Sequence, residues 1–155
     1  CCLGTTMKKA DSKAAFEKVD FTYPLELAKA TKIHGAKQFH LITAMGANPK
    51  SIFYYNQVKG KVEAAIRGLD FENLNIYRPS LLLGERKEQR FGEKVASVFS
   101  WILGPFLVGN LKKYRGVRAE VVARAMLHIS MKSLEGTHVF PSDVIQRQGG
   151  NPILP

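Results

Sequence analysis

Short apolar runs alternate along this chain with longer segments in which apolar side chains recur every three or four residues. Uncharged apolar runs are typical of strands buried on both faces, and the three- to four-residue period is typical of helices with one apolar side. This alternation predicts an α/β fold with a parallel sheet and helices on both faces. The predicted strands are 38–44, 74–77, 137–140 and a strand end at 1–3, and the predicted helices are 52–69, 93–103 and 118–131.

A long helical pattern precedes the strand predicted at 38–44. It begins after Ser12, a residue type that caps helix N-termini, and Gly35 ends it. Pro24 lies inside the pattern, where a proline breaks or kinks a helix unless it begins a new helical turn. The sequence therefore predicts an interruption near Pro24.

The composition is that of one ordinary globular domain. The chain has 155 residues, of which 45% are hydrophobic and 23% charged, and this excludes disordered and collagen-like proteins. No apolar run reaches the roughly 20 residues that a membrane-spanning helix needs, so no membrane association is expected. The net charge of +10 favours acidic partners. Nucleic acid is not the expected partner, because the basic segment 112–118 has a single aromatic residue, Tyr114.

Cys1 and Cys2 are the only cysteines. Adjacent cysteines seldom pair with each other, because the geometry is strained, and no third cysteine is present. This usage predicts a reducing compartment, and we expect a cytoplasmic protein whose cysteines are buried as small apolar side chains. No histidine stands at a spacing typical of a metal site, so no metal is predicted.

Tyr55 and Lys59 form a Tyr-x-x-x-Lys pair in the helix predicted at 52–69. This spacing places both side chains on one face of a helix, one turn apart. A phenol is a poor acid near neutrality, and a neighbouring ammonium favours its phenolate form. Thr43, at the end of the preceding strand, adds a hydroxyl that can hold a substrate carbonyl for protonation. An isolated pair is more often a half-buried tyrosine and a solvated lysine, but the preceding strand and its hydroxyl residue favour the catalytic interpretation.

Three strand exits are the expected ligand-binding places, because ligands of parallel α/β sheets bind beyond the carboxyl ends of the strands. They are residues 4–6, 43–48 and 78–83. The residues with candidate catalytic chemistry therefore lie in or beside the predicted ligand-binding edge of the sheet.

Five separated stretches of the chain carry a resemblance to a known family. They are CLGTT, VDFTYPLELAKA, HLITAMGANPKSIFYYNQVKGKVEA, NIYRPSLLLGER and VVARAML. With these stretches in this order, the chain resembles the atypical short-chain dehydrogenase/reductases. The resemblance is to the NAD(P)H-binding group that includes the Tat-interacting oxidoreductase and its bacterial relatives. The resemblance extends from Cys2 to about Arg147. It implies a Rossmann-type fold and an oxidoreductase that transfers hydride to or from a small-molecule carbonyl or alcohol.

The resemblance also implies roles for individual residues. By motif position, Thr43 supplies the catalytic hydroxyl, Tyr55 donates the proton, and Lys59 binds ribose and tunes the phenol. The implied cofactor is NADP or NAD, with NADP favoured. The cofactor-binding residues that the resemblance implies are Leu3, Gly4, Thr5, Thr6, Tyr55, Lys59, Pro79, Leu81 and Leu82.

Two departures from the family leave alternatives open. Thr43 is followed by Ala44, where the family often has a second hydroxyl residue. The glycine-rich turn of the family's first βαβ unit is absent, and isolated glycines cannot replace it. The sequence therefore predicts the C-terminal portion of a doubly wound Rossmann-type sheet, as one domain over 1–155, either cut from a longer protein or covering its open edge as a homodimer. The alternative function is a non-catalytic dinucleotide-binding protein with a regulatory or redox-sensing role.

Overall fold

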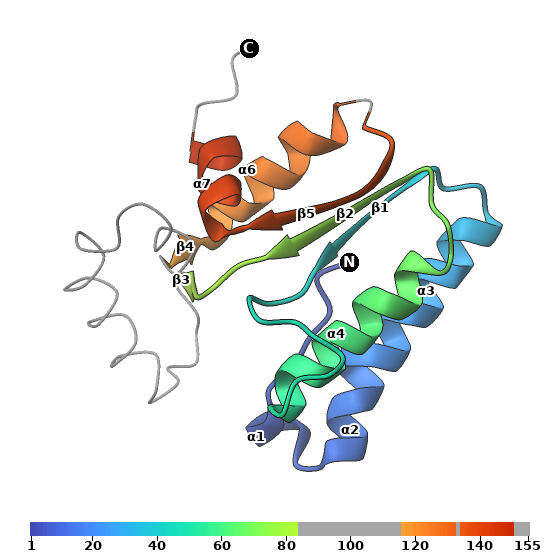
Figure 1. The fold of residues 1–155 in the computed structure, drawn as a ribbon, viewed down its shortest axis with the longest axis vertical. Coiled ribbons are helices and arrows are strands. Elements are labelled where there is room, and N and C mark those ends of the chain that lie inside the picture. Colours follow the sequence, from blue (N-terminus) through green and yellow to red (C-terminus); the bar gives the residue numbers. More distant parts are fainter. Residues whose placement is uncertain (84–115, 133, 151–155) are drawn as a thin grey trace. The chain divides into compact units, whose positions relative to one another are not determined.

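The computed structural model describes residues 1–83, 116–132 and 134–150 (Figure 1). It confirms an α/β fold, with a parallel three-stranded sheet flanked by helices, consistent with the C-terminal portion of a Rossmann-like fold. The chain divides into two compact units, one formed by Cys1–Arg78 with Leu134–Val139 and the other by Pro79–Ser133 with Phe140–Pro155. The helix predicted at 93–103 and most of the basic segment 112–118 lie outside the described residues.

The first unit contains the sheet and the helices that pack on it. Its helices are α1 (Met7–Ala10), α2 (Lys13–Glu17), the π-helix η1 (Lys18–Thr22), α3 (Tyr23–Ile33) and α4 (Tyr54–Arg67). Its strands β1 (Gln38–Ile42) and β2 (Asn73–Arg78) run parallel, and β5 (Gly136–Pro141) follows β2 in the sheet order β1-β2-β5. Helices α3 and α4 lie side by side along the sheet (Figure 1).

The helical pattern before β1 is interrupted, as Pro24 predicts. Ser12 caps α2, since its Oγ accepts a hydrogen bond from Ala15 N at 3.1 Å. The chain then passes through the π-helix η1, and Pro24 lies in the first turn of α3, where its missing N–H is no loss. Gly35 follows α3 with a φ of +83°, a conformation that glycine adopts without strain. Pro24 therefore follows a π-helical turn inside a segment that stays helical from Lys13 to Ile33.

One face of the sheet carries the hydrophobic core of the first unit. Alternate residues of β1 and β2 point to this face and pack against α3 and α4. Each fully buried aliphatic side chain contributes roughly 1.5–3 kcal/mol through removal from water. The core residues are Ala28, Phe39, Leu41, Val62, Ile66, Phe71, Leu74 and Ile76.

The opposite face of β1 and β2 is polar, so the prediction that the first of these strands is buried on both faces is wrong. His40 Nε2 lies 2.9 Å from Gln38 Oε1, and His40 Nδ1 lies 2.9 Å from the Tyr77 hydroxyl. On β2, Asn75 Nδ2 donates to Asn73 Oδ1 at 2.7 Å. Polar side chains can be buried when they hydrogen-bond to one another, and these contacts pair His40 with Tyr77 and Asn75 with Asn73. Asn75 Oδ1 is buried without a hydrogen-bond partner among the described residues.

We expect His40 to make the stability of the chain sensitive to acid. Burial lowers the pKa of His40 from its ordinary value of about 6.5. Below about pH 6.5, His40 of the unfolded chain binds a proton, whereas buried His40 of the folded chain binds it less readily. Protonation therefore favours the unfolded state, and the free energy of unfolding should fall as the pH falls through about 6.5. Urea unfolding at several pH values measures this. The dependence should weaken in His40→Gln and persist in the control His34→Gln, which changes an exposed histidine; an equal dependence in both variants would contradict the assignment.

A strand end is predicted at 1–3, and the structure assigns no regular secondary structure to these residues, although Cys1 bonds to β1 as the end of a parallel strand does. Cys1 N donates to His40 O at 2.6 Å, and Ile42 N donates to Cys1 O at 3.1 Å. These two bonds have the pattern of a single parallel bridge to β1. The prediction of two buried cysteines is wrong, because Cys2 is exposed and Cys1 is half-buried, and both are free thiols.

The second unit contains a short parallel strand pair and two packed helices. β3 (Leu82–Leu83) pairs with β4 (Val117–Arg118), and these are followed by α6 (Ala119–Ser130) and α7 (Ser142–Gly150). Helices α6 and α7 approach closely at Gly149, where a Cβ would overlap the backbone of Val121. No helix in the part of the chain that the structure describes is long and apolar enough to cross a membrane.

Candidate functional site

Three polar residues stand at four-residue intervals on α4: Tyr55, Lys59 and Glu63. This spacing puts them along one face of the helix. The side chain of Tyr55 is partly exposed, whereas Lys59 and Glu63 are buried. A buried charge requires a partner of opposite charge, and the structure gives one to each.

Lys59 is paired with Asp20 of η1. Its Nζ lies 2.7 Å from Asp20 Oδ1, and the two side chains are 6% and 0% exposed. Asp20 Oδ2 accepts a hydrogen bond from Thr5 N at 2.8 Å, so each carboxylate oxygen of Asp20 faces a donor. A Cβ on Gly4 would lie 3.2 Å from Asp20 Oδ1 and 3.4 Å from Lys59 Nζ. Asp20 thus joins the predicted catalytic lysine to the predicted cofactor-binding turn.

Tyr55 lies one turn before Lys59, near the start of α4. Its ring centroid is 5.8 Å from that of the buried Phe16, so one part of the phenol ring is packed. The whole residue is nevertheless 39% exposed. The neighbouring Tyr54 has a different environment, since its hydroxyl lies 3.1 Å from Lys13 O. Of these two tyrosines, Tyr55 is the one whose spacing from Lys59 fits the predicted chemistry.

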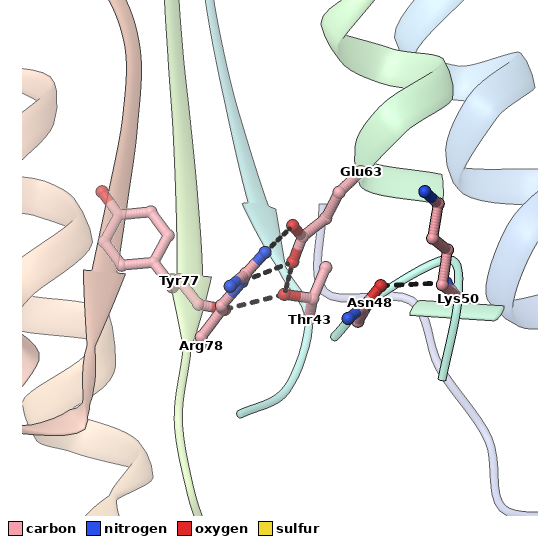
Figure 2. Close-up of polar contacts among 6 residues, drawn as sticks. All are labelled: Thr43, Asn48, Lys50, Glu63, Tyr77 and Arg78. Carbon is pink, nitrogen blue, oxygen red and sulfur yellow. Dashed lines mark hydrogen bonds and ion pairs between the residues drawn. The ribbon is translucent and has the colours of Figure 1, made fainter. Parts of the chain in front are cut away.

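Glu63 is the centre of a second buried cluster, shown in Figure 2. Thr43 Oγ1 donates to Glu63 Oε1 at 2.6 Å. Arg78 Nε donates to the same oxygen at 3.0 Å, and Arg78 Nη2 donates to Glu63 Oε2 at 2.5 Å. The hydrogen bond to Glu63 raises the pKa of Arg78, against the opposing effect of burial. Because Thr43 follows β1 and Arg78 ends β2, Glu63 attaches the carboxyl ends of two neighbouring strands to α4.

The loop after β1 returns to α4 at Gly60. A Cβ on Gly60 would overlap the backbone of Asn48 and Pro49. Asn48 N donates to Asn56 O at 3.0 Å, and Asn48 Oδ1 accepts from Lys50 N at 2.9 Å (Figure 2). The absence of a side chain at Gly60 therefore permits a close contact between this loop and the helix that carries Tyr55.

The structure places the predicted site residues in separate local environments. Gly4 and Thr5 lie with Lys59 at Asp20, whereas Thr43 lies with Glu63. Pro79, Leu81 and Leu82 belong to the second unit, where Leu81 O accepts a hydrogen bond from Val117 N at 2.8 Å. The catalytic roles of Thr43, Tyr55 and Lys59 and the cofactor-binding roles of the remaining residues stay predictions.

Asp20 and Glu63 are site residues that were not predicted from the sequence. A signal for Glu63 was available, because it follows Lys59 by four residues on a helix face whose neighbours are buried. No comparable signal marked Asp20, which stands between the apolar Val19 and Phe21 inside a segment with an ordinary helical pattern. The two carboxylates hold the positions of Lys59 and Thr43, so they are part of the candidate site.

Similar proteins are known from fungi and from a mammal. The protein named fmp52, mitochondrial, of Emericella nidulans is 35% identical over 153 residues, which cover 93% of this chain and 65% of that protein. HTATIP2 of Rattus norvegicus is 44% identical over 110 residues, 67% of this chain and 45% of that protein. FMP52, mitochondrial, of Candida albicans is 38% identical over 135 residues, 86% of this chain and 58% of that protein.

These similarities show that the chain is related to the Fmp52 and HTATIP2 proteins. The chain spans less than two thirds of the length of each of these relatives. No protein-family model matches it.

The prediction of a cytoplasmic protein is wrong. Several relatives, including those of Emericella nidulans and Candida albicans, carry the word mitochondrial in their names. The prediction rested on two cysteines without a further partner, a feature that indicates a reducing environment and does not distinguish one reducing compartment from another.

Proposed function

We propose that this chain is part of a mitochondrial NAD(P)H-dependent oxidoreductase of the short-chain dehydrogenase/reductase class. The reaction is hydride transfer to or from a small-molecule carbonyl or alcohol. The relation to HTATIP2 and Fmp52 supports a nicotinamide dinucleotide-binding, oxidoreductase-like protein. One structural observation carries the proposal: Lys59, one turn after Tyr55 on α4, has its Nζ beside the Gly4 turn.

The groups around Gly4 suit a ribose. Asp20 Oδ1 is a buried carboxylate oxygen, and its ion-pair partner, the donor Lys59 Nζ, lies 2.7 Å from it. A sugar hydroxyl both donates and accepts, so it complements such a pair, and Gly4 has no side chain to keep a sugar away. Because Asp20 and Lys59 have opposite charges, the pair suits a neutral hydroxyl better than a phosphate. NADP and NAD both contain ribose hydroxyls.

Each residue of the site has a separate task in the proposed reaction. The bound nicotinamide supplies or accepts the hydride. Tyr55 gives a proton to the carbonyl oxygen during reduction and receives it during oxidation. Lys59 keeps a positive charge one helical turn from the phenol, and Asp20 fixes the position of that charge. The exposed part of Tyr55 gives a substrate access to the phenol.

We expect Tyr55→Phe to reduce kcat/KM about a hundredfold or more, because it removes the proton donor and keeps the ring. The measurement is the oxidation of NADPH by the full-length protein with acetophenone or cyclohexanone. Tyr54→Phe is the matched control, since it removes the adjacent hydroxyl, which lies beside Lys13 O; its kcat/KM should stay within about threefold of the unchanged protein. A loss of less than about tenfold in Tyr55→Phe would remove Tyr55 from the role of general acid.

A second candidate function is the binding of a dinucleotide without turnover. The observation in its favour is that the hydroxyl proton of Thr43 is donated to Glu63, which leaves no proton there for a substrate carbonyl. NADPH binding measured by calorimetry, combined with no turnover on a panel of carbonyls and alcohols, would favour this regulatory function over the enzyme.

A further inference from the structure

We propose that Asp20 is a positioning residue that keeps Tyr55 in its protonated, proton-donating form by compensating the charge of Lys59. The inference rests on the proposed oxidoreductase function. It deepens that function by naming the residue that sets the pH range in which the site can reduce a carbonyl. It follows from the burial and the contacts of the ion pair between η1 and α4.

Lys59 is a buried cation one helical turn after Tyr55. Side chains at this spacing lie along one face of the helix, and a positive charge at this range favours the phenolate over the phenol. The Lys59 side chain is 6% exposed, so water screens its charge little. Without a counter-charge, Lys59 would therefore cause Tyr55 to lose its proton at a lower pH.

Asp20 supplies the counter-charge. Its Oδ1 lies 2.7 Å from Lys59 Nζ, and its side chain is 0% exposed. Its Oδ2 accepts the hydrogen bond from Thr5 N, which fixes the carboxylate and favours its ionised form. A cation and an anion in contact have no net charge, so their combined effect on a third group is much smaller than that of the cation alone. The pair therefore gives the phenolate little support.

Other charged side chains lie along α4, and each has a contact elsewhere. Glu17 Oε2 lies 3.4 Å from the Tyr54 hydroxyl, and Lys13 Nζ lies 5.2 Å from the centroid of the Tyr54 ring. These contacts place both charges beside the neighbouring tyrosine, so we expect the proton of Tyr55 to respond to Asp20 far more than to Glu17. The charged side chains with contacts along this helix, besides the buried pair, are Lys13, Glu17, Lys61, Glu63 and Arg78.

The protonated form of Tyr55 is the form that reduction requires. Tyr55 gives its proton to the carbonyl oxygen as the carbonyl carbon receives hydride from the bound nicotinamide, and the phenolate that remains regains a proton from water. The phenolate can begin only the reverse step, in which an alcohol is oxidised. By favouring the phenol, Asp20 extends to higher pH the range in which the site can begin a reduction.

The pH dependence of acetophenone reduction tests the inference. With saturating NADPH, kcat/KM of the full-length protein should fall at the pH where Tyr55 loses its proton. Asp20→Asn keeps the size of the side chain and removes its charge, so the fall should begin at a pH lower by about one unit or more. A purely structural role for Asp20 would lower kcat/KM at every pH and leave the position of the fall unchanged. That result would overturn the inference.

Glu17→Gln is the matched control. It removes a carboxylate that is 41% exposed and lies beside the Tyr54 hydroxyl, so it should leave the position of the fall unchanged. A displacement as large as that in Asp20→Asn would show a general effect of lost negative charge and overturn the inference. Tyr55→Phe identifies the group that titrates, because the fall should be absent from its residual activity.

NMR of the full-length protein with isotope-labelled tyrosine measures the same proton without turnover. The Tyr55 signal is the one absent from Tyr55→Phe, and its titration midpoint should be lower in Asp20→Asn than in the unchanged protein. Asp20→Leu combined with Lys59→Met tests the inference even if Asp20→Asn does not fold, because it leaves no buried charge unpaired. If Asp20 compensates Lys59, this double variant should keep the midpoint within about half a pH unit. A larger upward move would show that Lys59 acts uncompensated and would overturn the inference.

The outcomes separate this inference from the proposed function. If the full-length protein reduces neither acetophenone nor cyclohexanone, the proposed function fails, and the NMR titration still decides whether Asp20 keeps Tyr55 protonated. Equal midpoints in Asp20→Asn and the unchanged protein would overturn the inference in that case too. If the protein reduces a ketone, Tyr55→Phe abolishes the reaction and Asp20→Asn leaves the pH profile in place, the inference alone is overturned.

Discussion

Replacing Asp20 by alanine is expected to lower the free energy of unfolding by about 3–5 kcal/mol. The substitution leaves the buried ammonium of Lys59 without an opposite charge and removes the acceptor of the Thr5 N–H. Urea unfolding, followed by circular dichroism, measures the change. The matched control is Glu26→Ala, which breaks an ion pair with Lys29 whose side chains are 59% and 46% exposed. Such surface pairs contribute about 0–1 kcal/mol, so the control should lose far less.

A double substitution identifies the cause of the expected loss at Asp20. In Asp20→Leu combined with Lys59→Met, both buried charges are replaced by apolar side chains of similar size. This variant should recover much of the stability that Asp20→Ala loses, although it gives up the chemistry assigned to Lys59. If Asp20→Ala is no less stable than Glu26→Ala, or if the double variant is as unstable as Asp20→Ala, the unpaired charge is not the cause.

Gly60→Ala is expected to lower the free energy of unfolding by about 3 kcal/mol, because the new methyl group would overlap the backbone of Asn48 and Pro49. Alanine is favoured over glycine inside a helix by about 1 kcal/mol, which is too little to compensate. Gly68→Ala is the control, since Gly68 follows α4 with a φ of −68° and its nearest neighbour to an added Cβ is Ala65 O at 3.4 Å. Urea unfolding of both variants tests the difference. Equal stabilities would show that the loop moves aside at little cost.

The strongly periodic elements of the fold could be predicted from the sequence. The strands β1 and β2 and the helices α4 and α6 follow the spacing of apolar residues, because that spacing directly reports which side chains are buried. Helix α7 was not predicted, because its last residues, Gly149 and Gly150, disfavour a helix. Its contact with Val121 requires glycine, so packing prevails over local preference there.

The candidate site could be predicted only where it obeys a helical period. Tyr55 and Lys59 were identified by their spacing on one uninterrupted helix. Asp20 lies in a π-helix, whose wider turn contains an additional residue, so a period of 3.6 residues does not report which way its side chain points. The partnership of Thr43 with Glu63 connects residues 20 positions apart, and no local pattern encodes it.

The Glu63 cluster also has a consequence for how β1 and β2 find their alignment. Side chains alternate between the two faces of a strand, so a slip of two residues between β1 and β2 would keep apolar residues on the core face. In the native register Ile42 is opposite Tyr77, which brings Thr43 level with Arg78. A slipped pairing would separate these two side chains, and a single carboxylate could no longer bind both. Glu63 therefore penalises an alternative strand alignment that hydrophobic burial alone would tolerate.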